Sequence, residues 1–314
     1  MKTIKPKVLK KGDLIGLVAP ASTPSSEEKV NQSIKYLEQL GYRVKLGESV
    51  YKIFGYLAGT DKERAKDFND MVKDRKIKAI FALRGGYGTP RILSMIDYTS
   101  LRKNPKIIVG YSDITALQLA VFRKTGLITF SGPMPAIDMC NGMDSYTEEH
   151  FWRCLTSINR IGLLSNPVNK PLRILRPGIA RGHLLGGTIS LLVSLLSTPF
   201  QPQLSNSILV IEDIDEAPHR VDRMLAQLYN AGVLQKLSAL VYGKFINCIP
   251  SDLSVPHLTL EQIQKDYAKK VCCPVASDFQ YGHVTPKLTI PLGVKAMLDT
   301  KRKCIEVLES AVVE

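Results

Sequence analysis

The chain has 314 residues, of which 45% are hydrophobic and 7% aromatic, so it can bury a large core and is expected to form two domains. Its formal charge of +13 indicates attraction to an anion such as nucleic acid, a membrane surface or a polycarboxylate substrate, although an ordinary soluble basic protein carries such a charge too. Lys and Arg are spread along the chain without a signature of RNA or DNA reading, and no apolar run approaches the roughly 18 residues of a membrane span. We therefore expect neither nucleic-acid binding nor membrane insertion.

The first apolar run has some features of an export signal. Lysines precede LIGLVAPA, and Ala19-Pro20-Ala21 is similar to a cleavage site. However, Asp13 interrupts the pattern, and the uncharged stretch before Pro20 is shorter than the ~7–15 residues of a signal-peptide core. We therefore predict that residues 14–20 form a first β-strand and that the protein is cytoplasmic.

The rest of the first half alternates between the hydrophobic periods of helices and strands. Ser25 and Glu28 form a capping-box pattern at the start of the first helix, and Gly41 ends it. Repeated β–α units of this kind predict a parallel sheet with helices on both faces. The predicted strands are 14–20, 42–48, 79–84 and 106–110, and the predicted helices are 25–41, 61–74, a short segment before 106, and 113–122.

Residues 157–178 are rich in Asn, Pro and Arg, lack a clean period and are predicted to connect two domains. This organisation places an N-terminal α/β domain at 1–156 and a mixed α/β domain at 179–314. Within the second domain we predict strands at 207–213, 238–245 and 287–293, helices at 185–196, 218–232 and about 259–270, and a final hairpin around Thr300.

Six cysteines lack the paired C-x-x-C spacing of a zinc site, and the adjacent Cys272 and Cys273 suit a single tetrahedral ion poorly. They are typical of mostly buried thiols in a reducing compartment. The sequence therefore predicts neither a metal site nor a cofactor.

Ser112 lies where the apolar run 106–110 changes abruptly into the helix-like run 113–122. A serine on a sharp strand-to-helix turn is lifted clear of the sheet, and the following amides point toward whatever it attacks. The glycine-rich loop RGGYG (84–88) also follows a strand, so both lie at the carboxyl edge of the sheet, where ligands bind. The loop is either a tight turn or a source of backbone N–H groups that share an oxyanion with the amide of Asp113.

A serine nucleophile needs a base, and five histidines are candidates. We expect His150 and His257 to be solvated and His219 to join a surface ion network. His183 precedes a predicted helix and could either cap this helix or line the cleft. His283 lies in YGHVTPK, a loop bounded by Gly and Pro, and such loops can aim a side chain into a cleft. His283 is therefore the first candidate and His183 the second.

The base needs an orienting carboxylate, and four acids crowd together at the end of the predicted strand 207–213: Glu212, Asp213, Asp215 and Glu216. A carboxylate at the carboxyl end of a strand can accept the other ring N–H of a histidine and stabilise the imidazolium. Equally, the cluster can simply start the next helix, whose N-terminus favours negative charge. Spacing does not choose among the four.

Several short motifs are spread over nearly the whole chain. They are LIGLVAPAS, FALRGGYGTPRIL, VGYSDITALQLA, TFSGPM, GHLLGGTISLL, LVIEDIDEAPHRVDRML and GHVTPKLTIPLG. In this order they resemble the LD-carboxypeptidase family, which includes the muramoyltetrapeptide carboxypeptidases of peptidoglycan recycling and relatives that confer immunity to microcin C. The serine turn GYSDI lacks the second glycine of G-x-S-x-G, so an ordinary α/β-hydrolase is not indicated.

The resemblance implies an N-terminal domain like that of class I glutamine amidotransferases, a smaller mixed α/β C-terminal domain, and a Ser–Glu–His triad assembled across the cleft. The triad carries over as Ser112, Glu212 and His283, with oxyanion donors at the amides of Asp113 and Gly86. The family's enzymes are typically cytoplasmic homodimers that need no metal. The implied activity is release of terminal D-alanine from the L,D-peptide bond of a murein tetrapeptide.

A carboxypeptidase also recognises a free carboxylate, and a cation in bidentate geometry does this best. Arg84 and Arg91 flank the glycine loop and are candidates, with His183 as a further substrate-binding candidate. A role in structural ion pairs would account for the presence of these two arginines equally well.

Two alternatives remain. A microcin-immunity peptidase would cut a peptidyl-adenylate analogue and would need a platform for the nucleotide, but Trp152, the only tryptophan, lies in a predicted helix rather than in a cleft loop. Outside enzymes, the alternative is a basic two-domain protein that binds anionic ligands, with Ser112 as a helix cap.

Overall fold

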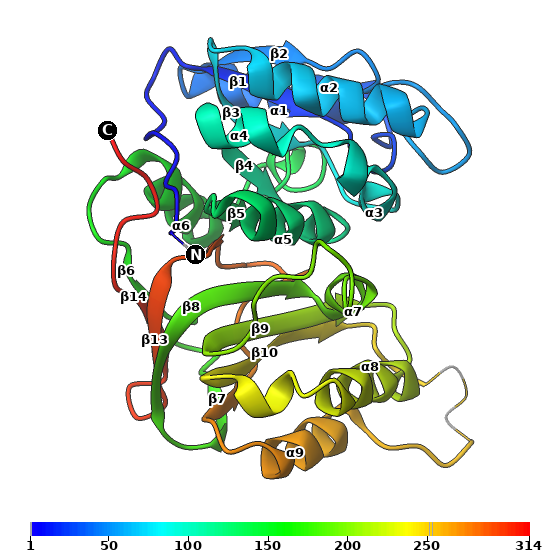
Figure 1. Cartoon of the computed structure of the whole chain (residues 1–314), viewed down its shortest axis with the longest axis vertical. Helices are drawn as coiled ribbons and strands as arrows, with labels where there is room; N and C mark the ends of the chain where they lie inside the picture. The colour runs from blue at the N-terminus through cyan, green and yellow to red at the C-terminus, as the bar shows by residue number, and fades with distance from the viewer. Residues whose placement is uncertain (1, 251, 253) are drawn as a thin grey trace.

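Two β-sheets organise the chain, one drawn above the other in Figure 1. The computed structural model describes residues 2–250, 252 and 254–314. The first sheet has the strand order β12-β5-β4-β3-β1-β2; β1 to β5 are parallel, and β12 is antiparallel to β5. Its strands are β1 (Leu14–Val18), β2 (Arg43–Leu46), β3 (Ile77–Ala82), β4 (Ile107–Gly110), β5 (Thr129–Ser131) and β12 (Ile290–Leu292). Its helices are α1 (Glu27–Gln39), α2 (Asp61–Lys73), α3 (Thr89–Ile92), α4 (Tyr98–Lys103), α5 (Ile114–Thr125) and α6 (Ser145–Thr156).

The second sheet is mixed, in the order β6-β14-β13-β8-β9-β10-β11-β7. Its central strands β8 to β11 are parallel, and antiparallel strands flank them on both sides. The strands are β6 (Gly162–Leu164), β7 (Arg173–Arg176), β8 (Ile179–Thr188), β9 (Ser207–Ile214), β10 (Ala239–Ile246), β11 (Val275–Ser277), β13 (Lys295–Asp299) and β14 (Cys304–Val307). The helices are α7 (Ile189–Ser194), α8 (Pro218–Asn230) and α9 (Leu260–Lys270). The predicted α/β fold with parallel strands is confirmed.

Two predicted elements are wrong in detail, each for a physical reason. Residues 185–188 are predicted to be helical but extend β8, because this segment pairs with β9, and α7 begins only at Ile189. Gly186 has a φ of 152°, and a β-carbon there would collide with the carbonyl oxygen of Val210. The pairing of β8 with β9 therefore overrides the helical hydrophobic pattern of residues 185–188. At α1, Ser26 rather than Ser25 is the cap, and its side chain accepts the amide of Lys29 at 3.3 Å.

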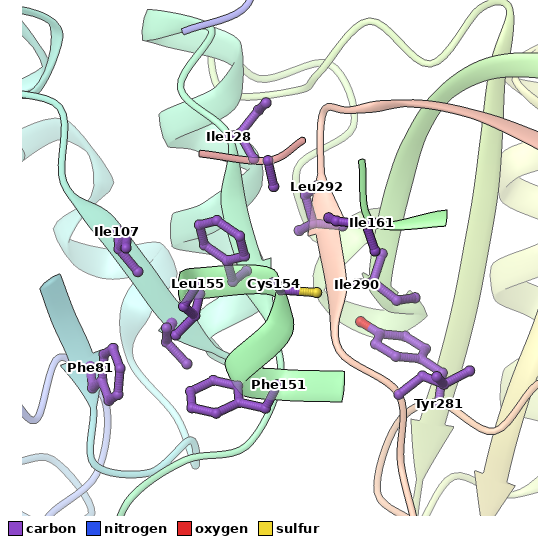
Figure 2. Close-up of a cluster of buried hydrophobic side chains, with 14 of the residues drawn as sticks. Phe81, Ile107, Ile128, Phe151, Cys154, Leu155, Ile161, Tyr281, Ile290 and Leu292 are labelled. Atoms are coloured by element: carbon purple, nitrogen blue, oxygen red, sulfur yellow. The ribbon is translucent and has the colours of Figure 1, made fainter. Parts of the chain in front are cut away.

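The boundary between the two units differs from the predicted irregular connection. Residues 157–178, predicted to be a connection, contain β6 and β7, which pair within the second sheet. Near the other end of the chain, β12 leaves the second unit and joins the edge of the first sheet. Figure 2 shows Ile290 and Leu292 of this strand in one apolar cluster with Ile128 and Tyr281. The division at 1–156 and 179–314 stays a prediction, with β12 as the strand that crosses it.

The position of β12 matters because it holds the segment that precedes it. Ile290 pairs with Ser131 and Leu292 with Thr129, so the residues just before β12 run beside the carboxyl end of β5. The hydroxyl of Tyr281 lies 2.6 Å from that of Ser131 and adds a second tie. The loop around residue 283 is therefore fixed between the two sheets.

Two further observations concern the class of protein. Across the residues that the structure describes, helices are all too short or too polar to cross a bilayer. The cysteine thiols are free; Cys140, Cys154, Cys248 and Cys304 are buried, Cys273 is half-buried and Cys272 is exposed. Mostly buried thiols are confirmed.

Candidate active site

Ser112 occupies the turn between β4 and α5, as the sequence predicts. Its φ is 62°, a left-handed conformation that non-glycine residues adopt only where the surrounding structure imposes it. The strand ends at Gly110, and α5 begins at Ile114, so the chain reverses direction within three residues. A serine held in such a turn presents its hydroxyl above the sheet edge.

The glycine loop lies directly against this serine. A β-carbon at Gly85 would lie 2.7 Å from Cβ and 2.9 Å from Oγ of Ser112, so the backbone approaches as closely as only glycine permits. The next residue, Gly86, has a φ of 116° and contacts Ser22. Neither the amide of Gly86 nor that of Asp113 donates to an acceptor within the described part of the chain. Both N–H groups are therefore available to a ligand.

The far end of the glycine loop is braced by buried charged groups. The carboxylate of Asp113 accepts the amide of Thr89 at 2.8 Å, and burial raises the pKa of Asp113 above its ordinary value. Arg64, fully buried, donates to the carbonyl of Gly88 at 3.1 Å and also bonds the carbonyl of Pro20. The loop is thus rigid before any ligand arrives, which reduces the entropy that binding costs.

Glu212 and His283 form the second half of the site. Nδ1 of His283 lies 2.8 Å from Oε2 of Glu212, whose side chain is 1% exposed. Thr188, at the end of β8, donates to the other carboxylate oxygen at 2.6 Å. Gly282, with a φ of 107°, leaves room for this contact, since a β-carbon there would lie 2.5 Å from Oε2. Both carboxylate oxygens are engaged, so Glu212 is fixed in place and the imidazole contacts it through Nδ1.

Tyr111 connects the two halves of the site. Its ring lies edge to face with the imidazole of His283, with centroids 5.1 Å apart, and it immediately precedes Ser112. Lys287 donates to the Tyr111 hydroxyl at 3.1 Å and pairs with Asp138 at 2.7 Å. Burial raises the pKa of Tyr111 well above its ordinary value, so the ring stays a neutral phenol. The imidazole of His283 therefore lies beside the turn that contains Ser112.

The other three acids of the cluster have different partners. Asp213 accepts the amide of Ser190 at 3.0 Å, and burial raises the pKa of Asp213 to about 6. Asp215 accepts from Asn247 at 2.9 Å, and Glu216 lies 3.6 Å from Arg220. Of the four acids, Glu212 is the one that contacts a histidine in the described structure.

The two arginine candidates differ in their surroundings. Arg91 is exposed and holds Asp61 in a bidentate pair, with Nε and Nη2 at 2.9 and 3.0 Å from the two carboxylate oxygens. Arg84 makes one long bond, 3.4 Å to the carbonyl of Thr23, and its buried Nε has no partner in the described part of the chain. Arg84 directly precedes the glycine that touches Ser112, so it is the better placed of the two.

The remaining histidines lie elsewhere. His183 lies within β8, with Nδ1 2.9 Å from the carbonyl of Gly293, and five residues of extended strand, roughly 16 Å, separate it from Thr188. The structure does not bring it to Glu212 and His283. His257 and His219 are exposed, whereas His150 is half-buried against Tyr146 rather than solvated.

Sequence reasoning missed four residues that shape the site: Thr188, Tyr111, Gly282 and Lys287. Two of them could have been found from the sequence, because Gly282 and Lys287 lie in the same YGHVTPK segment as the candidate histidine. Thr188 lay inside a predicted helix, which hid its place at a strand end. Among the described residues, no group of three His, Cys, Asp or Glu side chains is arranged to hold a metal ion.

The chain is similar to known proteins over nearly its whole length. The probable murein peptide carboxypeptidase of Bacillus subtilis (strain 168) is 41% identical over 99% of this chain and 96% of its own length. The microcin C7 self-immunity protein MccF of Escherichia coli is 30% identical over 95% of this chain and 94% of its own length. The crystal structure of muramoyltetrapeptide carboxypeptidase from Oxalobacter formigenes superposes with a TM-score of 0.81 at 30% identity, covering 94% of this chain and 97% of that one.

The family itself follows from matches in both halves of the chain. Residues 15–132 match the LD-carboxypeptidase N-terminal domain, and residues 181–298 match the LD-carboxypeptidase C-terminal domain. The first range contains Ser112, and the second contains Glu212 and His283. Together with near-complete coverage by a 41% identical relative, these matches show that the chain belongs to the LD-carboxypeptidase family.

Proposed function

We propose that this protein is a serine-type LD-carboxypeptidase that releases terminal D-alanine from the L,D-peptide bond of murein tetrapeptides. The observation that carries the proposal is the 2.8 Å contact between Glu212 and His283, which lies beside the turn that holds Ser112. The names of the relatives from Bacillus subtilis and Oxalobacter formigenes point to the same class of substrate.

In the proposed reaction, His283 removes the proton of Ser112 as the hydroxyl oxygen attacks the carbonyl carbon of the scissile bond. The amides of Gly86 and Asp113 donate to the oxyanion, and Glu212 stays ionised and stabilises the imidazolium. His283 then returns the proton to the departing amine of D-alanine. Water, deprotonated by His283, hydrolyses the acyl-enzyme and regenerates the Ser112 hydroxyl.

Chromatography of a digest of defined muropeptides tests the activity. We expect tetrapeptide forms to be converted to tripeptide forms with one free D-alanine per cleavage, and pentapeptide forms to persist. Intact tetrapeptides after prolonged incubation would contradict the proposal. Comparing substrates with diaminopimelate and with lysine at the third position also identifies the stem that the enzyme prefers.

The terminal carboxylate is expected to bind Arg84 rather than Arg91. Arg84→Gln should raise KM for a D-alanine-terminated peptide about 10-fold or more, the usual effect of losing a charged hydrogen bond, and should leave KM for the C-terminal amide unchanged. Arg91→Gln is the matched control and should leave both values nearly unchanged, because Arg91 is engaged with Asp61. Equal KM values for acid and amide in the wild type would show that no carboxylate clamp exists.

The alternative substrate is a peptidyl- or aminoacyl-adenylate analogue, and the similarity to MccF of Escherichia coli is the observation that favours it. Trp152 does not support it, because the indole stacks on Tyr42 at 5.2 Å and donates to the hydroxyl of Tyr36 at 2.9 Å. These contacts make it part of the packing around α6. Incubation with a peptidyl-adenylate analogue and with a tetrapeptide, side by side, distinguishes the two substrates.

We also propose that the enzyme acts in the cytoplasm as a homodimer. The resemblance to the family implies both properties, and the buried free thiols fit a reducing compartment. A substrate with a free carboxylate also fits the formal charge of +13.

A further inference from the structure

The connection between β2 and α2 exposes aromatic side chains beside the glycine loop. Tyr56 and Tyr87 are 64% and 70% exposed, and their rings form an edge-to-face pair with centroids 5.8 Å apart and planes at 71°. The same connection exposes three more large apolar side chains, Tyr51, Ile53 and Phe54. Exposed apolar groups gathered in one place mark binding surfaces more often than singly scattered ones do.

The backbone under this aromatic pair is held in place. Leu57 is buried and contacts Gly88, and Phe54 and Leu57 exchange backbone hydrogen bonds of 2.9 and 3.1 Å. The hydroxyl of Thr23 donates to the carbonyl of Lys52 at 2.6 Å. On the partner segment, the amide of Tyr87 donates to the hydroxyl of Ser22 at 3.2 Å. Both rings are therefore presented on braced loops, so little ordering is needed when a ligand binds.

The pair also lies within reach of the nucleophile. Tyr87 is two residues from Gly85, whose backbone touches Ser112, and two residues span at most about 7 Å. Figure 1 shows the connection between β2 and α2 extending toward the side of the molecule where α3 follows the glycine loop. In a murein tetrapeptide, three residues separate the sugar from the scissile carbonyl, a span of about 10 Å when extended. A stem bound with its third residue at Ser112 is therefore long enough to extend its sugar past the glycine loop toward the aromatic pair.

We propose that Tyr56 and Tyr87 form a subsite for the sugar ring of a muropeptide, which makes the enzyme prefer sugar-linked stems to free peptides. This inference rests on the proposed function. The C–H face of a pyranose packs on an aromatic face, and the phenol hydroxyls can bond the ring hydroxyls and the N-acetyl group. Because the two rings meet at 71°, they present aromatic faces in two different directions to a bound sugar. The pair lies next to the glycine loop that touches Ser112. This position suits the sugar end of a bound substrate better than it suits a second protein chain.

The test compares a muramoyl-tetrapeptide with the free tetrapeptide of the same stem. The wild type should give a higher kcat/KM for the sugar-linked substrate by about 10-fold, the size that a stacked and hydrogen-bonded ring gives. Tyr56→Ser combined with Tyr87→Ser should reduce this preference to near one through a higher KM, and should leave cleavage of the free tetrapeptide unchanged. Tyr56→Phe combined with Tyr87→Phe keeps both rings and should keep most of the preference.

The results that overturn the inference are distinct from those that overturn the function. Equal kcat/KM for the two substrates in the wild type, or a preference that survives the double serine variant, overturns the sugar subsite alone. A double serine variant that changes from dimer to monomer on sedimentation, with its substrate preference unchanged, shows instead that these rings form an interface between copies. A wild type that cleaves neither substrate overturns the proposed function and the subsite with it.

Discussion

Ser112→Ala is expected to lower kcat for D-alanine release by about 10⁴-fold or more, because the attacking oxygen is lost and only binding and oxyanion stabilisation remain. The backbone at this position has a φ of 62°, and alanine has to adopt the same conformation as serine. Folding should therefore be preserved. Single-turnover kinetics and thermal melting of the two proteins measure both effects, and near-normal turnover by the alanine variant would exclude Ser112 as the nucleophile.

A covalent probe provides the control for that result. A fluorophosphonate should label the wild type at Ser112 and should fail to label Ser112→Ala. Labelling at another serine would reassign the nucleophile. A wild type that is inert toward the probe and toward muropeptides would support a binding protein for anionic ligands. The predicted role of Ser112 as a helix cap is wrong in either case, because Asp113 holds the capping position of α5.

Glu212→Gln is expected to lower kcat by about 10³- to 10⁴-fold, because a neutral amide neither holds the Nδ1–H tautomer of His283 nor stabilises the imidazolium. In the wild type, Oε2 of Glu212 lies 2.8 Å from the imidazole, and Oε1 accepts from Thr188 at 2.6 Å. The glutamine can keep only part of this arrangement. KM should change little, since the carboxylate acts through His283 rather than on the substrate. The pre-steady-state acylation rate is the most direct measurement.

Asp213→Asn is the matched control for the Glu212 variant. It removes the adjacent carboxylate, whose pKa burial already raises to about 6, and which contacts the amide of Ser190 rather than a histidine. The other carboxylate oxygen accepts the amide of Ile214 at 2.9 Å, and asparagine can still accept one of these two amides through Oδ1. We therefore expect kcat close to that of the wild type. A loss as large as that of Glu212→Gln would mean that the whole acidic cluster, and not one carboxylate, orients the base.

The first sheet was largely predictable because its β–α units are local patterns. The strands β1 to β4 and the helices α1, α2 and α5 follow hydrophobic periods and capping residues close to the predicted ranges. Prediction failed at residues 185–188, where an apolar, glycine-containing segment fits a helix by pattern but is drawn into β8 by pairing with β9. It also failed to place residues 290–292 in the first sheet, since strand partners far apart in sequence leave no local signal.

The site was predictable to a different extent for each residue. The Ser112 turn and the glycine loop are visible as strand ends, and the Gly282 to Pro286 loop marks His283 as unusual. Arg84 and Arg91 were indistinguishable by spacing, and the structure separates them because Asp61, thirty residues away from Arg91, occupies that guanidinium. Their part in binding a carboxylate stays a prediction, as do the roles of the triad residues.

By itself, the sequence determined the family, the α/β class and the short segments in which a nucleophile and a base could lie. Turn residues, helix caps and hydrophobic periods depend only on residues that are close together in the chain. Spacing alone did not choose among the four acids; the resemblance implied Glu212, and the tertiary structure gives the physical reason why this acid meets the histidine. Successive side chains of a strand point to opposite faces, so Glu212 and Asp213 have different neighbours although they are adjacent in the chain. The loop of His283 reaches the Glu212 face because β12 is paired with β5, a contact between segments about 160 residues apart.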